Sequence, residues 1–138
     1  MSSLKELHNL SYDTSGFNSG LINWYNQLID KTYNDLSVSD VCKMIRQDIL
    51  KDIAIQKAVD LFICDPYCGE YYDGGLLDVL VSLDMKLINI VTLEKLKTVL
   101  KTVYRTYAGF EWPDEDTKIQ YMKNVEIMLK SLKKTNAN

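Results

Sequence analysis

Apolar residues recur three or four positions apart along almost the whole chain, and no segment alternates for long between apolar and polar residues. An α-helix has 3.6 residues per turn, so this spacing places the apolar side chains on one face of each helix. The chain has 138 residues, of which 46% are hydrophobic, and this suffices for one core. We therefore predict an all-α fold, a compact bundle of about six helices that forms a single domain over residues 1–138, with a polar tail from about residue 134.

Six segments carry the helical pattern. The predicted helices cover residues 20–31, 36–50, 52–65, 74–84, 92–109 and 114–134. The third is apolar nearly all round, so we expect it to be the central and most buried helix. Pro66 should end it, because proline disfavours helical backbone at the residue before it. The last helix is expected to turn an apolar stripe inward, formed by Ile119, Met122, Val125, Leu129 and Leu132.

Two helix starts carry capping signals. Ser37 is followed three residues later by Asp40, which is a capping box with a shorter acid than usual. Asp73 precedes the pair Gly74-Gly75, and its carboxylate could accept from the free N–H groups of the helix that follows. We therefore predict Ser37 and Asp73 as N-caps.

Acidic residues gather in two segments. No basic residue lies between Lys57 and Lys86, and the acids of that interval are Asp60, Asp65, Glu70, Asp73, Asp78 and Asp84. A second acidic run, EWPDED, covers residues 111–116. The formal net charge is −3, which argues against nucleic-acid binding, because nucleic-acid binders need a basic surface. The charge pattern favours a basic partner instead.

No apolar run approaches the ~20 residues that a membrane span needs. The first residues, MSSLKELHNLSYDTSG, contain no apolar core of a secretory signal. We therefore expect a cytoplasmic protein without a membrane partner.

Catalytic and metal-binding patterns are weak. The three cysteines, Cys42, Cys64 and Cys68, form neither a disulfide framework nor a zinc motif, so we expect free thiols that are buried or half-buried. His8 is the single histidine and has no nucleophile motif beside it. Gly74-Gly75 lacks the lysine and hydroxyl of a phosphate-binding loop. We predict that the protein is not an enzyme and holds no cofactor or metal.

Aromatic residues are interleaved with both acidic segments, as in a protein-binding surface where aromatic side chains anchor and acids steer. A second interpretation remains open, in which the aromatic residues belong to the core and the acids are merely solvated. The candidate partner-binding residues are Glu70, Tyr71, Tyr72, Asp73, Asp78, Trp112, Asp114, Glu115 and Asp116.

Residues 36–84 resemble the immunity proteins of contact-dependent growth inhibition systems. The resemblance rests on LSVSDVCKMIRQDI, an apolar helix after it, and DPYCGEYYDGGLLDVLVSL. The matching positions are Leu36, Arg46, Gln47, Asp65, Pro66, Tyr72, Gly74, Leu76, Leu77 and Leu80. The chain departs from the pattern at Gly75, where an acid is expected, and at Asp73, where proline is frequent.

The resemblance implies a cytoplasmic immunity protein that neutralises one toxin domain delivered by a neighbouring bacterium. Toxins of this kind are often nucleases, including RNases, so the acidic and aromatic residues above would cover a basic cleft without any reaction. A monomer or weak dimer is expected. The alternative is a helical adaptor or regulatory module without a toxin, which would bind a partner protein or itself through the stripe from Leu93 to Tyr107 or through the basic last helix.

Overall fold

The computed structural model describes residues 2–15 and 19–136, and these form helices without any strand. The α-helices are α1 (Leu4–Leu7), α2 (Gly20–Ile29), α3 (Val38–Arg46), α4 (Lys51–Cys64), α5 (Gly75–Leu80), α6 (Ile90–Thr106) and α7 (Glu115–Asn136). Three short 3-10 helices join them, η1 (Tyr33–Asp35), η2 (Met85–Leu87) and η3 (Tyr107–Gly109). The all-α prediction is confirmed, and the short α1 is the helix that the apolar pattern did not predict. None of the helices in the described ranges has the length and apolar character that crossing a bilayer requires.

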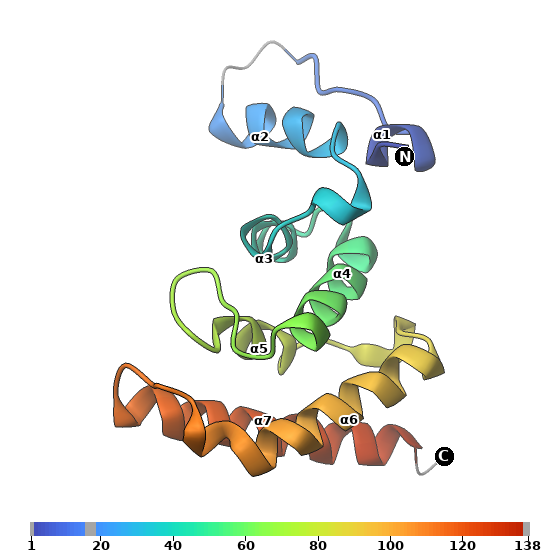
Figure 1. The fold of residues 1–138 in the computed structure, drawn as a ribbon. Coiled ribbons are helices and arrows are strands. Elements are labelled where there is room, and N and C mark those ends of the chain that lie inside the picture. Colours follow the sequence, from blue (N-terminus) through green and yellow to red (C-terminus); the bar gives the residue numbers. More distant parts are fainter. Residues whose placement is uncertain (1, 16–18, 137–138) are drawn as a thin grey trace.

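The helices succeed one another from one end of the molecule to the other (Figure 1). α1 and α2 lie together at the end that contains the N-terminus, α3 and α4 follow, and α6 and α7 pack side by side at the far end. α4 contacts α3, α5 and α6, and it buries Ala54, Ile55, Val59 and Phe62. The prediction that this segment forms the central helix is confirmed.

Local signals set the bounds of α3 and α4. Ser37 caps α3 and forms a reciprocal capping box with Asp40, as predicted. The chain leaves α4 at Asp65, whose extended backbone (φ −146°, ψ 94°) is the conformation expected before Pro66. Both features are decided by neighbours within three residues.

The inner face of α7 differs from the predicted stripe. Val125 and Leu132 are buried, as predicted, whereas Ile119 is exposed. Tyr121 and Asn124 are buried instead, although both carry polar groups. The phase of the helix follows from Tyr121, whose ring packs inward and whose hydroxyl donates to the Pro66 carbonyl at 2.7 Å. α7 also continues through residues 134–136, which were assigned to the polar tail.

The predicted cap at Asp73 is wrong. Gly74 occupies the N-cap position of α5 in a left-handed conformation (φ 79°), and no side chain caps the helix. A Cβ atom on Gly74 would lie 2.6 Å from Cδ2 of Tyr121. Glycine is therefore required both by the backbone angle and by the packing of α7, and the Asp73 side chain is left exposed.

Candidate functional site

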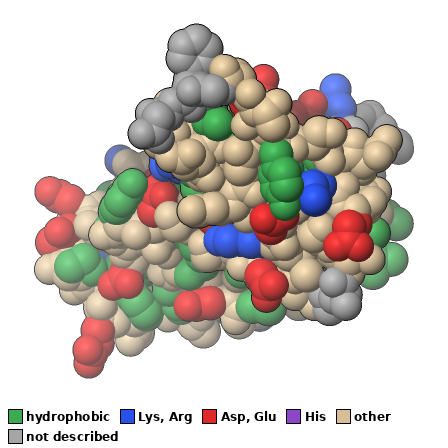
Figure 2. Space-filling model, turned by 90° about the horizontal axis from the view of Figure 1, so that it is seen from above, with side chains coloured by type: hydrophobic (Ala, Val, Ile, Leu, Met, Phe, Trp, Pro, Cys, Tyr) green, Lys and Arg blue, Asp and Glu red, His purple; other side chains and the backbone are tan. Residues whose placement is uncertain are grey.

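Acidic side chains are distributed over the face shown in Figure 2, with apolar and basic side chains between them. Exposed acid alone therefore does not mark a site. The segment that connects α4 to α5, residues 65–74, is called the acidic loop below. Some acids at this loop are engaged in contacts with α3 or α7 and stabilise the fold. Others make no such contact and are available to bind a partner.

The acidic loop is tightly folded on itself. The amide of Gly74 donates to the Tyr67 carbonyl at 2.7 Å, and the amide of Leu76 donates to the Cys68 carbonyl at 3.1 Å. A Cβ atom on Gly69 would lie 2.0 Å from the carbonyl oxygen of Tyr72. A loop with such internal contacts presents its side chains in one arrangement before any partner arrives.

An aromatic cluster anchors the loop to α7. It consists of Tyr67, Phe110, Trp112 and Tyr121. The rings of Tyr67 and Phe110 are stacked with centroids 4.1 Å apart, and the rings of Trp112 and Tyr121 are 4.8 Å apart. The indole Nε1 of Trp112 donates to the Tyr107 carbonyl at 2.8 Å. Trp112 is thus half-buried in a packed cluster. This agrees with the second interpretation given above, in which the aromatic residues belong to the core.

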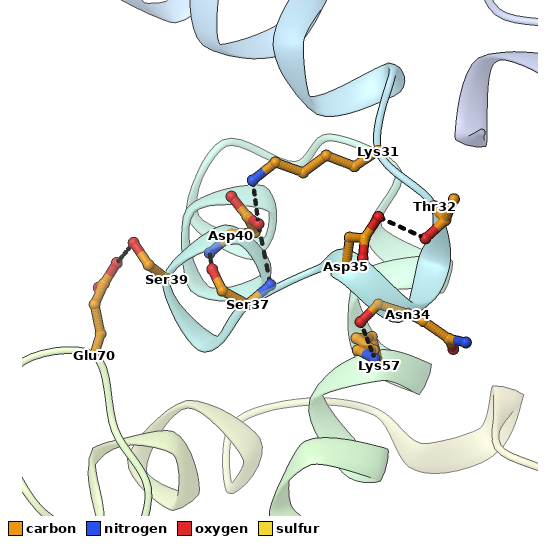
Figure 3. Close-up of polar contacts among 9 residues, drawn as sticks. All are labelled: Lys31, Thr32, Asn34, Asp35, Ser37, Ser39, Asp40, Lys57 and Glu70. Atoms are coloured by element: carbon orange, nitrogen blue, oxygen red, sulfur yellow. Dashed lines mark hydrogen bonds and ion pairs between the residues drawn. The ribbon is translucent and has the colours of Figure 1, made fainter.

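Glu70 is paired within the molecule. Arg46 donates to its carboxylate through Nη1 at 2.7 Å and Nη2 at 3.4 Å, and the Ser39 hydroxyl donates at 3.2 Å (Figure 3 shows the Ser39 contact). The Arg46 guanidinium holds the pKa of Glu70 below its ordinary value. Glu70 therefore ties the loop to α3, and its charge is largely cancelled by Arg46. Next to it, the Tyr71 side chain is 80% exposed.

Asp78 is held by neutral groups. One carboxylate oxygen accepts from the Tyr72 hydroxyl, and the other accepts from the Asn124 amide of α7. The hydrogen bond to Asp78 raises the pKa of Tyr72 to about 12, so this hydroxyl stays protonated. Neither donor carries a charge, so these two contacts do not form an ion pair with Asp78.

The two acidic segments converge on one pocket, called the acidic pocket below. It encloses about 340 Å³ between the acidic loop and the start of α7. Its walls are formed by Tyr72, Asp73, Gly74, Asp78, Asp116, Thr117, Gln120 and Tyr121. Three of these residues are acids and none is basic. Within the described chain, neither Asp73 nor Asp116 forms an ion pair.

The remaining candidates of the second acidic run lie outside the pocket lining. The Asp114 carboxylate accepts from the Thr117 amide at 2.7 Å, as an N-cap does, and this bond lowers the pKa of Asp114. Glu115 is exposed in the first turn of α7. Sequence reasoning missed Thr117, Gln120 and Asn124. Of these three, only Asn124 could have been recognised from the sequence. It is a polar residue that lies three positions after Tyr121 and next to Val125, and the side chains of Tyr121, Asn124 and Val125 are all buried.

The cysteines are free, but their burial differs from the prediction. Cys42 is buried and Cys68 half-buried, whereas Cys64 is exposed at the end of α4. Burial raises the pKa of Cys68 to about 11, so its thiol is protonated at neutral pH. No group of three metal-ligating side chains occurs in the part of the chain that the structure describes.

A family model described as CDI immunity proteins matches residues 6–98. The match includes α2 to α5 and the whole acidic loop, and it ends within α6. No curated protein matches the chain.

Proposed function

The chain belongs to the CDI immunity proteins, and on that premise we propose that it inhibits a nuclease toxin, an RNase in the favoured case, by binding the basic surface that holds the nucleic acid. Proteins of this family neutralise a toxin and catalyse no reaction. The proposed site is the acidic pocket together with the exposed Tyr71. Because a nuclease meets its substrate inside the cell, we also propose that the protein acts in the cytoplasm.

The observation that carries the proposal is the convergence of Asp73, Asp78 and Asp116 on one pocket whose lining contains no basic residue. A nuclease needs Lys and Arg side chains around its cleft to hold phosphates. Carboxylates placed close together can take the position of those phosphates, and their field speeds the capture of a basic surface.

Aromatic contact area would complete the interface. Tyr71 is 80% exposed and Tyr72 is 51% exposed, and both lie next to the pocket acids. Tyrosine supplies a large contact area at small entropic cost, and for this reason it is enriched among residues that dominate binding energy. Glu70, Trp112 and Asp114 are proposed to support the surface indirectly, because their side chains bond to other groups of this chain.

One of the two surfaces that the adaptor alternative requires, the apolar stripe of α6, is not accessible. Leu93, Leu96, Leu100 and Val103 of the α6 stripe are buried in the core, so they cannot receive a partner. Ile90 and Val91 remain exposed at the start of α6 and form a shallow apolar pocket with Ile63. An adaptor that uses this patch would associate with itself or with an apolar segment.

The test is co-expression with the toxin domain encoded directly upstream, followed by titration of the purified pair. Restored growth and an affinity of about −12 kcal/mol, which corresponds to a nanomolar Kd, are expected. Loss of nuclease activity at a one-to-one ratio would support occlusion of the cleft. Absence of both rescue and binding would contradict the proposal. A stable dimer of the free protein in sedimentation would favour the adaptor.

A further inference from the structure

Asn124 is a buried polar residue that does not cap a helix. It is 3% exposed and lies in the middle of α7. Two of the other buried polar side chains, Ser3 and Asp40, belong to capping boxes. Burying an amide costs free energy unless its hydrogen bonds are made, and an apolar side chain would pack here without that cost. The hydrogen bonds that Asn124 makes therefore indicate why an amide stands at this buried position.

Those contacts lead directly to the acidic pocket. The Asn124 side-chain oxygen accepts from Nε2 of Gln120 at 3.1 Å, and its nitrogen donates to one oxygen of Asp78. The other oxygen of Asp78 accepts from the Tyr72 hydroxyl. A continuous chain of hydrogen bonds thus runs from α7 through α5 to the acidic loop, and three of its four members line the pocket.

A neutral donor suits this position. A lysine or arginine at residue 124 would also hold the Asp78 carboxylate, but it would cancel the charge, as Arg46 does for Glu70. An amide fixes the direction of the carboxylate and leaves the charge available to a cation in the pocket. Because Asn124 and Tyr72 contact the two oxygens of one carboxylate, the direction in which Asn124 holds Asp78 also places the oxygen that the Tyr72 hydroxyl contacts.

We propose that Asn124 is a positioning residue for toxin binding, which orients Asp78 and, through it, Tyr72 against a basic side chain of the toxin. This inference rests on the proposed function. Asn124 is itself too buried to touch the toxin, so its effect passes through the two pocket residues that it contacts, Asp78 and Gln120.

The test is a double-mutant cycle read as Kd for the upstream toxin domain. Asn124→Leu keeps the branched shape of the side chain and removes its hydrogen-bonding groups, and Tyr72→Phe removes the hydroxyl at the other end. Each is expected to weaken binding about tenfold, and the double variant is expected to be little weaker than either single one, because both break the same chain. Asn124→Leu combined with Asp73→Asn is the control, and there the two effects should multiply.

A merely structural role for Asn124 predicts a different pattern. In that case Asn124→Leu would weaken binding by the same factor with and without the Tyr72 hydroxyl, which would overturn the inference. If Asn124→Leu does not fold, Asn124→Ala takes its place in the same cycle with Tyr72→Phe, because it removes the donor and adds no bulk. Tyr72→Phe is then expected to weaken binding little further in the Asn124→Ala background, and a loss of about tenfold there would overturn the inference.

The same measurements separate the inference from the proposed function. If Asp73→Asn, Asp116→Asn and Tyr72→Phe all leave the affinity unchanged, the toxin binds elsewhere and the proposed site fails. If these three weaken binding whereas Asn124→Leu does not, the site stands and only the positioning role of Asn124 fails.

Discussion

Arg46 at the end of α3 contacts both carboxylate oxygens of Glu70 in the acidic loop, 24 residues further along the chain. The Glu70 side chain is 10% exposed and that of Arg46 is 49% exposed. The pair is thus formed at the edge of the core, where a forked guanidinium–carboxylate contact is stronger than a freely exposed ion pair. It closes the acidic loop against α3, while the aromatic cluster holds the same loop against α7.

Removing this contact should destabilise the protein more than removing a surface charge. Arg46→Met is expected to lower the free energy of unfolding by about 1–2 kcal/mol, because the Glu70 carboxylate would lose its charged partner. Urea unfolding followed by circular dichroism measures the change. Lys51→Met at the exposed start of α4 is the control, with an expected change within about 0.5 kcal/mol. Equal losses in both variants would contradict the role assigned to the pair.

Acid should unfold the protein partly through Glu70 and Asp40. Burial acts to raise the pKa of Asp40, but the bonds from Lys31 at 2.8 Å and from the Ser37 amide at 3.0 Å (Figure 3) outweigh it, so the pKa is lowered. The pKa of Glu70 is lowered by Arg46. A depressed carboxylate pKa contributes stability above its unfolded value of about 4, and this stability is lost as the pH falls through the folded value.

The double variant Asp40→Asn with Glu70→Gln should therefore show a flatter acid limb. Unfolding free energies are measured in urea at intervals between pH 7 and about pH 2.5. The variant is expected to be less stable than the parent at pH 7 and to approach it as the pH falls below about 4. Parallel curves for the two proteins would show that these carboxylates do not carry the acid sensitivity.

Features decided by near neighbours were predictable from the sequence. The capping box of Ser37 and Asp40 and the end of α4 before Pro66 each depend on residues within one turn. The helical periodicity likewise predicted the central position of α4 and the burial of Val125 and Leu132 on α7.

Features that depend on distant contacts were not predictable. Glu70 reads as a free acid in the sequence, but its charge is cancelled by Arg46. Ile119 fits an apolar stripe, yet the phase of α7 is set by Tyr121, which reaches Pro66 across 55 residues. The two acidic segments were recognised separately, but only the packing of α7 against α5 brings Asp116 to the pocket that Asp73 and Asp78 line.

The acidic loop should not tolerate a side chain at Gly69. A Cβ atom there would lie 2.0 Å from the Tyr72 carbonyl oxygen and 2.7 Å from the Gly75 nitrogen, and both are backbone atoms that cannot rotate away. Gly69→Ala is expected to cost about 3 kcal/mol or more of unfolding free energy, because the loop must open. Gly20→Ala is the matched control, since no atom lies within 4 Å of a Cβ atom at that position. A similar melting temperature for the two variants would show that the loop is less tightly closed than its contacts indicate.

Charge reversal in the acidic pocket should slow association with the toxin. Asp116→Lys combined with Asp73→Lys is expected to lower the association rate constant at least tenfold in low salt, and much less at ~0.5 M salt, where the charges are screened. Stopped-flow mixing with the toxin domain at several salt concentrations measures the rate.

The control for this prediction distinguishes two effects of Asp116→Lys: the change of charge in the acidic pocket and the loss of helix stability. Asp116 lies in the first turn of α7, where an acid also stabilises the positive end of the helix. Asp52 lies in the first turn of α4, about 20 Å from the end that leads into the acidic loop. Single variants Asp116→Lys and Asp52→Lys should lose similar stability, whereas only Asp116→Lys should slow association. Equal rate constants for the two at every salt concentration would place the basic surface of the toxin away from the pocket.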